Sequence, residues 1–180
     1  MMRKIIIGVL WFVIILVIIL SCGLGYVIYE STVIEWWIAI AVAMAAALIT
    51  TPFYRKWRLL TSLDSRVVNL LFHWVCVGTI SYLAFLGGND WLSRSAVEYK
   101  EEVLIEGKYQ KRTEKVRQVR KYRYVSDGFR TEYYLLITFD NGETKMLHVS
   151  PAIFKKARKG KTRTIDLREG FFGFPVIVNK

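Results

Sequence analysis

The sequence contains few residues that serve covalent or metal chemistry. Its 180 residues include two cysteines and two histidines. Cys22 and Cys76 both lie in apolar stretches, and their placement fits neither a structural zinc site nor the disulfide framework of a small secreted domain. Residues 94–180 contain no cysteine, so this part of the chain must fold without a disulfide.

Sequence motifs of catalysis are also missing. We find no glycine-rich phosphate loop, no carboxylate pair at a catalytic spacing and no nucleophile elbow. His148 is followed two residues later by Ser150, which places both on one face of a predicted strand, but the sequence indicates no third member of a triad. We therefore interpret His148 as an ordinary strand residue, and we expect a protein that is not an enzyme and holds no cofactor or metal.

Charge is scarce in the first half of the chain. Residues 1–93 carry ten of the 41 Lys, Arg, Asp and Glu side chains. Three windows there are apolar over about the 20 residues that a helix needs to cross a bilayer. They are residues 5–29, 33–51 and 67–86. Backbone groups in hydrocarbon must satisfy their own hydrogen bonds, so the windows predict a three-helix transmembrane domain over residues 1–93.

The first window resembles in part a bacterial lipoprotein signal. Arg3 and Lys4 precede an apolar run that ends at Leu20-Ser21-Cys22-Gly23, where Cys22 would be lipidated after cleavage. The chain stays apolar as far as Tyr29, whereas a mature lipoprotein turns polar after its cysteine. We therefore expect an uncleaved membrane anchor.

Basic residues near the ends of the windows predict an orientation, because Lys and Arg prefer the cytoplasmic side. The loop between the first two windows has none. Six lie before the first window or between the second and third, namely Arg3, Lys4, Arg55, Lys56, Arg58 and Arg66. We expect the aromatic and basic residues of 53–60 to lie against lipid headgroups. Three spans then place the N-terminus inside and residues 94–180 outside the cytoplasm, in the inner membrane of a bacterium.

The second window carries small residues at every fourth position, which let helix backbones approach closely. These helix-packing residues are Ala39, Ala43 and Ala47. They predict packing among the three spans or, as an alternative, packing between copies of the chain or against a partner protein.

The third window carries a polar stripe within its apolar sequence. Asn69, His73 and Cys76 fall within about 60° of one another around a helix. Polar groups in lipid normally point toward the protein interior, and an ionisable one is a candidate functional residue. The stripe predicts either a hydrogen bond from His73 to a neighbouring span or part of a conduction path.

Residues 94–180 change to period-two alternation broken by turns, which is typical of strands. We predict strands over residues 97–105, 116–125, 129–139, 143–149, 163–167 and 171–178. Ser150-Pro151 predicts a helix start that Gly160 ends, and Asp127-Gly128 predicts a hairpin turn. The fold class expected is α+β, with three transmembrane helices followed by a small β-barrel or sandwich-like domain with one short helix. We expect the apolar residues 171–177 to close the core of that domain or, less favoured, to rest on the membrane.

Basic residues dominate this second domain, with 20 Lys and Arg against 11 Asp and Glu. The densest cluster is Lys111, Arg112, Lys115, Arg117, Arg120, Lys121 and Arg123. A second cluster is Lys155, Lys156, Arg158, Lys159, Lys161 and Arg163. Such patches indicate an anionic partner, unless they form only a solvated face.

These features predict a non-enzymatic bacterial membrane protein whose outer domain binds or scaffolds a partner protein with an acidic surface. It would be an accessory subunit of an envelope complex or a membrane immunity factor. The first alternative is a small oligomeric channel or transporter component, suggested by the alanine and polar stripes. The second is an inverted protein with a cytoplasmic nucleic-acid-binding domain, which the charge distribution around the spans disfavours.

Overall fold

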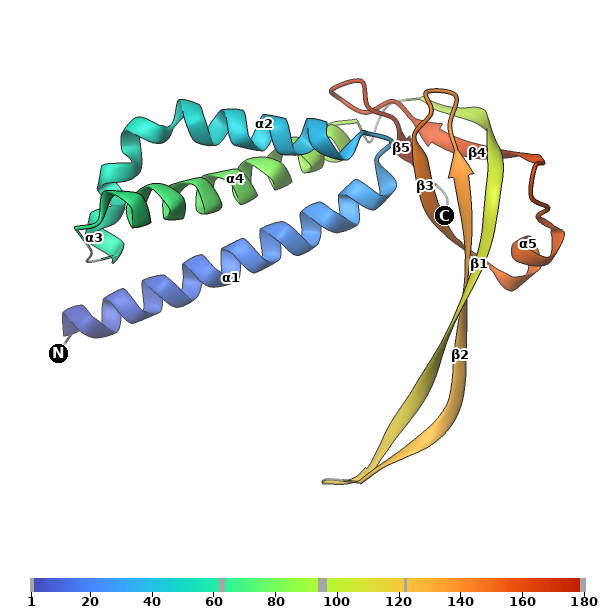
Figure 1. Cartoon of the computed structure of the whole chain (residues 1–180), viewed down its shortest axis with the longest axis horizontal. Coiled ribbons are helices and arrows are strands. Elements are labelled where there is room, and N and C mark those ends of the chain that lie inside the picture. Colours follow the sequence, from blue (N-terminus) through green and yellow to red (C-terminus); the bar gives the residue numbers. More distant parts are fainter. Residues whose placement is uncertain (1, 62–63, 94–96, 122, 179–180) are drawn as a thin grey trace. The chain divides into compact units, whose positions relative to one another are not determined.

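The computed structural model describes residues 2–61, 64–93, 97–121 and 123–178, and the chain divides into two compact units. The helical unit comprises Met1–Glu98 together with Arg168–Val176. The sheet unit comprises Tyr99–Leu167 and the residues from Ile177 onward. The helical N-terminal part and the strands that follow it are visible in Figure 1. We expected a single boundary near residue 94; in the structure the segment Arg168–Val176 belongs to the helical unit.

The helical unit contains five helical segments, α1 Met2–Ser31, α2 Trp36–Ile49, the 3-10 helix η1 Thr51–Trp57, α3 Arg58–Thr61 and α4 Arg66–Trp91. Two of them, α1 and α4, are long and apolar enough to cross a membrane. The window expected over residues 33–51 is a shorter helix, and α2 reaches that length only together with η1, from which it is bent by 69°.

Local chemistry explains where α2 ends. Alanine is the best helix former, and it is frequent along α2. The hydroxyl groups of Thr50 and Thr51 then donate to the carbonyl oxygens of Ala46 (2.8 Å) and Ala47 (3.0 Å) in the last turn of the helix. Pro52 has no N–H and cannot continue the helical ladder. α2 therefore ends at Ile49.

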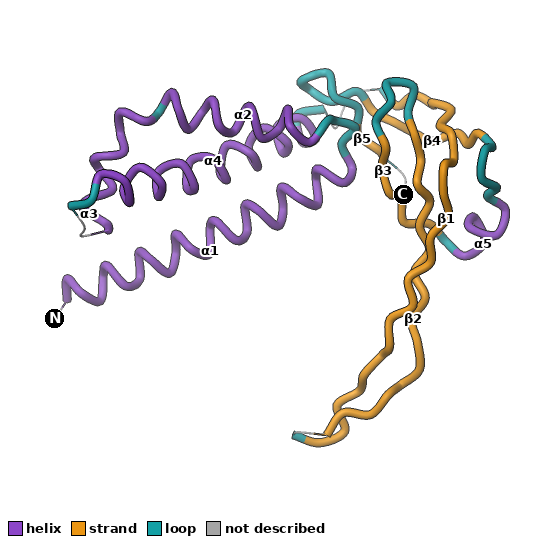
Figure 2. The backbone as a smooth tube through the Cα atoms, in the orientation of Figure 1, coloured by secondary structure: helices purple, strands orange, loops and turns teal. Residues whose placement is uncertain are grey.

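Both α1 and α2 pack against α4. Figure 2 shows the three helices as neighbouring rods. The core between them contains Ile28, Ile34, Ala39 and Leu86. Many other apolar side chains of α1 face outward, among them Ile5, Phe12 and Ile19, each more than half exposed. An exposed apolar surface of this extent is typical of a helix that faces lipid.

The sheet unit contains one sheet with the strand order β3-β2-β1-β4-β5. The strands are β1 Glu98–Arg120, β2 Arg123–Thr138, β3 Thr144–Val149, β4 Thr162–Arg168 and β5 Val176–Ile177. The sheet is antiparallel and does not close on itself, so the expectation of a barrel or sandwich was wrong. Its buried face is formed by alternating residues, as the period-two pattern predicts, and includes Val103, Ile105, Leu135, Ile137, Leu147, Val149, Ile165 and Leu167.

The expected strand end after residue 105 and the expected turn at Asp127-Gly128 are both bulges. The residues around Gly107 do not end a strand, because β1 continues through a register shift between Ile105 and Gly107. Asp127-Gly128 is not the hairpin turn, because β2 runs through it, with Gly128 at φ +86° and a second register shift opposite Glu114 and Val116. The positive φ of Gly128 suits both a glycine-type bulge and a tight turn, so glycine at that position fits either of them. The hairpin reverses between Arg120 and Arg123 instead.

The short helix α5 Pro151–Lys156 begins as expected, with the Ser150 hydroxyl accepting a hydrogen bond from the backbone N–H of Ile153 (3.4 Å). It ends at Lys156, earlier than Gly160, and Gly160 (φ +78°) instead forms the turn into β4. The ring of Phe154 packs against Tyr133 of β2, with the ring centroids 4.9 Å apart. This contact holds α5 against the sheet.

Candidate functional site: the basic arm and the buried polar cluster

The two longest strands continue beyond the rest of the sheet. β2 pairs with β3 only over Tyr133–Thr138, yet β1 and β2 pair with each other as far as Arg120 and Arg123. Residues 110–132 therefore form a two-stranded ribbon, here named the basic arm. In Figures 1 and 2 these two strands run on together past the ends of the other strands of the sheet.

The arm concentrates positive charge. It contains eight Lys and Arg residues and three Asp and Glu residues. All seven residues of the densest predicted cluster lie on it, from Lys111 at its base to the reversal between Arg120 and Arg123. The described side chains from Gln110 to Val119 are all exposed. The sequence thus located the charge, and the structure shows that it lies on an extended ribbon.

The arm uses little of this charge internally. Arg130 pairs with Glu132 (3.3 Å), and the Arg112 guanidinium lies 3.9 Å from the centre of the Phe129 ring. Lys115, Arg117 and Lys121 form no ion pair with any described side chain. At the tip, the register places Arg120 opposite Arg123. Most of the described charges of the arm are therefore not used in ion pairs within it.

Apolar side chains on the arm are also uncovered. Val116, Val119, Val125 and Phe129 are each 46% to 58% exposed. A two-stranded hairpin is marginally stable in water, and each of its outer edges presents unpaired backbone groups. Cations, apolar side chains and open strand edges together make a surface that a partner can bind by main-chain pairing and charge.

A second candidate site lies among the helices, where the polar stripe of α4 is buried. The Trp57 indole N–H of η1 donates to Nδ1 of His73 (2.8 Å). Because an indole N–H only donates, Nδ1 is the accepting nitrogen and the ring proton lies on Nε2. Nε2 then donates to Thr50 Oγ1 (3.1 Å), whose own hydroxyl bonds Ala46. Both ring nitrogens of His73 are therefore engaged with neighbouring segments.

The other members of the stripe are enclosed in the same way. Asn69 accepts from the Thr61 hydroxyl of α3 (2.6 Å) and donates to the Ser65 carbonyl (3.0 Å). Cys76 is buried and is a free cysteine. Trp74, the neighbour of His73, donates to Thr51 Oγ1 (3.1 Å). These bonds attach η1 and α3 to α4 and thereby fix the bend between α2 and η1.

The small residues of α2 are buried against another helix of the same chain. Ala39, Ala43 and Ala47 are the buried residues of α2, which packs on α4. Their faces are covered within the chain. The stripe therefore offers little free surface to a second copy.

Sequence reasoning missed a group of contacts at the end of α4. Asn89 is fully buried; its side chain donates to the Phe174 carbonyl (2.9 Å) and accepts from the Phe172 N–H (3.0 Å). Its neighbour Asp90 pairs with Arg168 (2.6 Å). The expected strand over residues 171–178 is therefore mostly a loop that closes the helical core, where Phe174 packs, and not the core of the sheet domain. The only sequence signal was a polar Asn-Asp pair at the end of an apolar window.

The remaining polar candidates have structural roles. The Ser150 hydroxyl caps α5, and the His148 ring packs at an edge-on angle against Tyr134 with the centroids 5.3 Å apart. Among the residues that the structure describes, no three His, Cys, Asp or Glu side chains gather as metal ligands. No protein-family model, curated protein or solved structure matches this chain.

Proposed function

We propose that this chain is a non-enzymatic bacterial membrane protein that binds an acidic partner protein through its basic arm. The observation that carries the proposal is the arm itself, a ribbon of exposed cations and open strand edges that contributes little to the core of its own sheet. Such a protein would act as an accessory subunit of an envelope complex or as an immunity factor.

The helical unit supports an orientation with the arm outside the cytoplasm. α1 and α4 run parallel, because Trp11 packs on Phe72 near their starts and Ile28 shares a core with Leu86 near their ends. If both cross the bilayer in the same direction, the segment that joins them must cross back. Among the described residues of that segment, α2 and η1 together are long and apolar enough to do so.

The lengths of α2 and η1 are consistent with a return of the chain across the bilayer. The 14 residues of α2 span about 21 Å, and η1 adds about 5 Å along the same axis after its 69° bend. The total of about 26 Å approaches the hydrocarbon thickness of about 30 Å. η1 would then lie near the headgroups, where Lys56, stacked on Phe53 at 5.0 Å, and Arg55 meet the cytoplasmic leaflet.

The test is co-purification of partner proteins with the full chain from a native membrane in mild detergent. The variant K115E/R117E/K121E reverses three exposed charges of the arm. The matched control K100E/K155E/K159E makes the same change in net charge at three exposed positions off the arm. We expect the arm variant to lose the partner and the control to retain it.

Salt dependence provides an independent measurement. Exposed charges steer association and are screened over about 8 Å at physiological ionic strength. Binding of the recovered partner should therefore weaken steeply as salt is raised. If neither salt nor the arm variant changes the set of recovered proteins, the arm is a solvated face and the proposal fails.

Nucleic acid is the second candidate partner, because a two-stranded basic ribbon fits the major groove of duplex DNA. This function requires the arm to lie in the cytoplasm. A reporter active only in the cytoplasm, fused after Lys180, decides between the two. We expect it to be inactive; activity would reverse the orientation and favour nucleic acid.

A further inference from the structure

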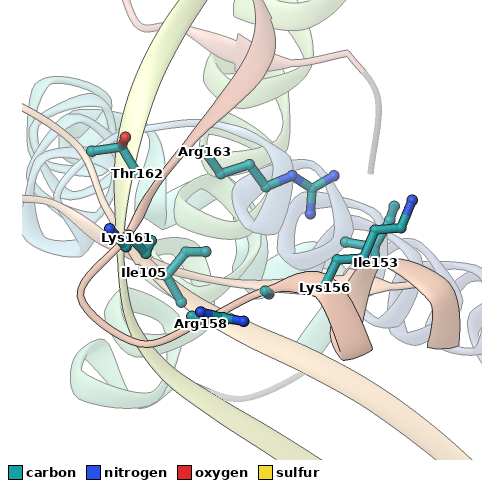
Figure 3. A pocket seen from close by; sticks show the side chains of 8 residues that line it. Ile105, Ile153, Lys156, Arg158, Lys161, Thr162 and Arg163 are labelled. Carbon is teal, nitrogen blue, oxygen red and sulfur yellow. The ribbon is translucent and has the colours of Figure 1, made fainter.

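A pocket of about 310 Å³ lies in the sheet unit between α5, the loop after it and the strands β1 and β4. Figure 3 shows it from close by. Its lining residues are Ile105, Ile153, Lys156, Ala157, Arg158, Lys161, Thr162 and Arg163. None belongs to the basic arm, so the pocket is a separate feature.

Backbone hydrogen bonds hold the walls of the pocket in place. The Gly160 N–H donates to the Ile105 carbonyl (2.8 Å), and the Ile105 N–H donates to the Lys161 carbonyl (3.0 Å). These two bonds fasten the loop after α5 to β1. Lys108 adds a third connection, donating to the Ala157 carbonyl (2.8 Å) while its ammonium lies over the Phe154 ring. The pocket is therefore formed before any ligand enters.

The charge around the pocket is uncompensated. Four of the eight lining residues are cationic and none is acidic. Within the described part of the chain, none of the four forms an ion pair. Four cations around one small cavity raise the local potential and attract an anion.

Arg163 is the most informative of the four. In Figure 3 its side chain runs from β4 toward α5, which carries Ile153 and Lys156. Its Nη1 is covered by protein atoms and has no hydrogen-bond partner among the described residues. A buried charged donor without an acceptor is costly, and an anion bound by this guanidinium would reduce that cost.

We propose that this pocket binds a phosphate group carried by a small molecule. A guanidinium offers a planar fork that matches phosphate oxygens, and lysines add point charges around it. The aliphatic side chains of Ile105 and Ile153 provide an apolar wall for the part of the ligand next to the phosphate. The volume is at the lower end of small-ligand pockets and excludes a nucleic-acid duplex.

The full chain is purified in detergent so that no phospholipid remains bound. It is then titrated with inorganic pyrophosphate at physiological salt, and calorimetry measures the binding affinity. Arg163→Gln should weaken binding about tenfold or more. Lys159→Gln removes the same charge from an exposed residue of the same loop that does not line the pocket, and should leave the affinity within about twofold. Arg163→Lys keeps the positive charge but not the planar guanidinium, so its affinity for pyrophosphate should lie between those of the other two variants.

A second arm distinguishes the source of the phosphate. The same proteins are titrated with dihexanoyl phosphatidic acid, a lipid phosphate soluble as a monomer. Tighter binding of this lipid than of pyrophosphate, with the same dependence on Arg163, assigns the pocket to a headgroup; the reverse order assigns it to a soluble phosphate compound. Absence of binding for both probes, or equal weakening by Arg163→Gln and Lys159→Gln, overturns the proposal. Both results are independent of partner recovery through the arm.

Discussion

In the helical unit, His73 and Asn89 are buried, and their side-chain nitrogen and oxygen atoms bond to groups from other segments. In the basic arm, Lys115, Arg117 and Lys121 are exposed and pair with no described carboxylate. A buried, fully bonded polar group rigidifies the structure around it, whereas exposed charges add little to stability. The buried polar residues therefore hold this chain together, whereas the exposed cations of the arm are available to bind a partner.

The largest effect is expected at Gly170, beside the buried Asn89. A Cβ at Gly170 would collide with the backbone carbonyl of Phe174 and with the Asn89 amide, neither of which can move without breaking their mutual hydrogen bond. Gly170→Ala should lower the free energy of unfolding by about 3 kcal/mol. Thermal unfolding of the full chain in detergent measures it.

Gly8 of α1 provides the control, because nothing lies within 4 Å of a Cβ placed there. Gly8→Ala should leave stability unchanged or raise it slightly through helix propensity. Equal stability of the two variants would show that the loop 168–176 does not close the helical core as described.

The two histidines of the chain allow a second, smaller comparison. His73→Ala removes both ring bonds and leaves the part-buried Trp57 N–H without its acceptor, so the free energy of unfolding should fall by about 2 kcal/mol. His148→Ala removes an exposed ring and should change the free energy of unfolding by less than about 0.5 kcal/mol. Chemical unfolding in detergent compares them.

Ion flux tests the rival role of His73. If His73 serves packing alone, vesicles containing folded His73→Ala protein should show the same ion permeability as vesicles containing the unaltered chain. A conductance that disappears with His73 while the protein stays folded would favour a channel.

The sequence predicted the elements whose signal is local. Apolar length alone located α1 and α4, and alternation located β3 almost residue for residue. The end of α2 followed from Pro52, but its bend depends on bonds from Thr50 and Trp57 to His73 in another helix. Those partners are brought together only by tertiary packing.

Features that depend on distant partners were missed. Gly107 and Gly128 mark changes of backbone direction, but only the opposing strand decides whether a glycine makes a turn or a bulge. Asn89 bonds residues more than 80 positions later in the chain. The basic cluster was visible as composition, whereas its place on a ribbon beyond the sheet follows from the register of β1 and β2.

Removing the arm should change stability less than Gly170→Ala or His73→Ala. Lys111 and Glu132 are opposed in the register, so Asn-Gly in place of residues 112–131 would join them by a two-residue hairpin turn. The removed residues form strand pairs with each other, and their described side chains bury no part of the core, so the free energy of unfolding should change by less than about 1 kcal/mol. Partner recovery should nevertheless be lost completely, while pyrophosphate binding at Arg163 remains. A shortened protein that fails to fold would mean that the arm stabilises the sheet, and a shortened protein that still recovers the partner would move the binding site off the arm.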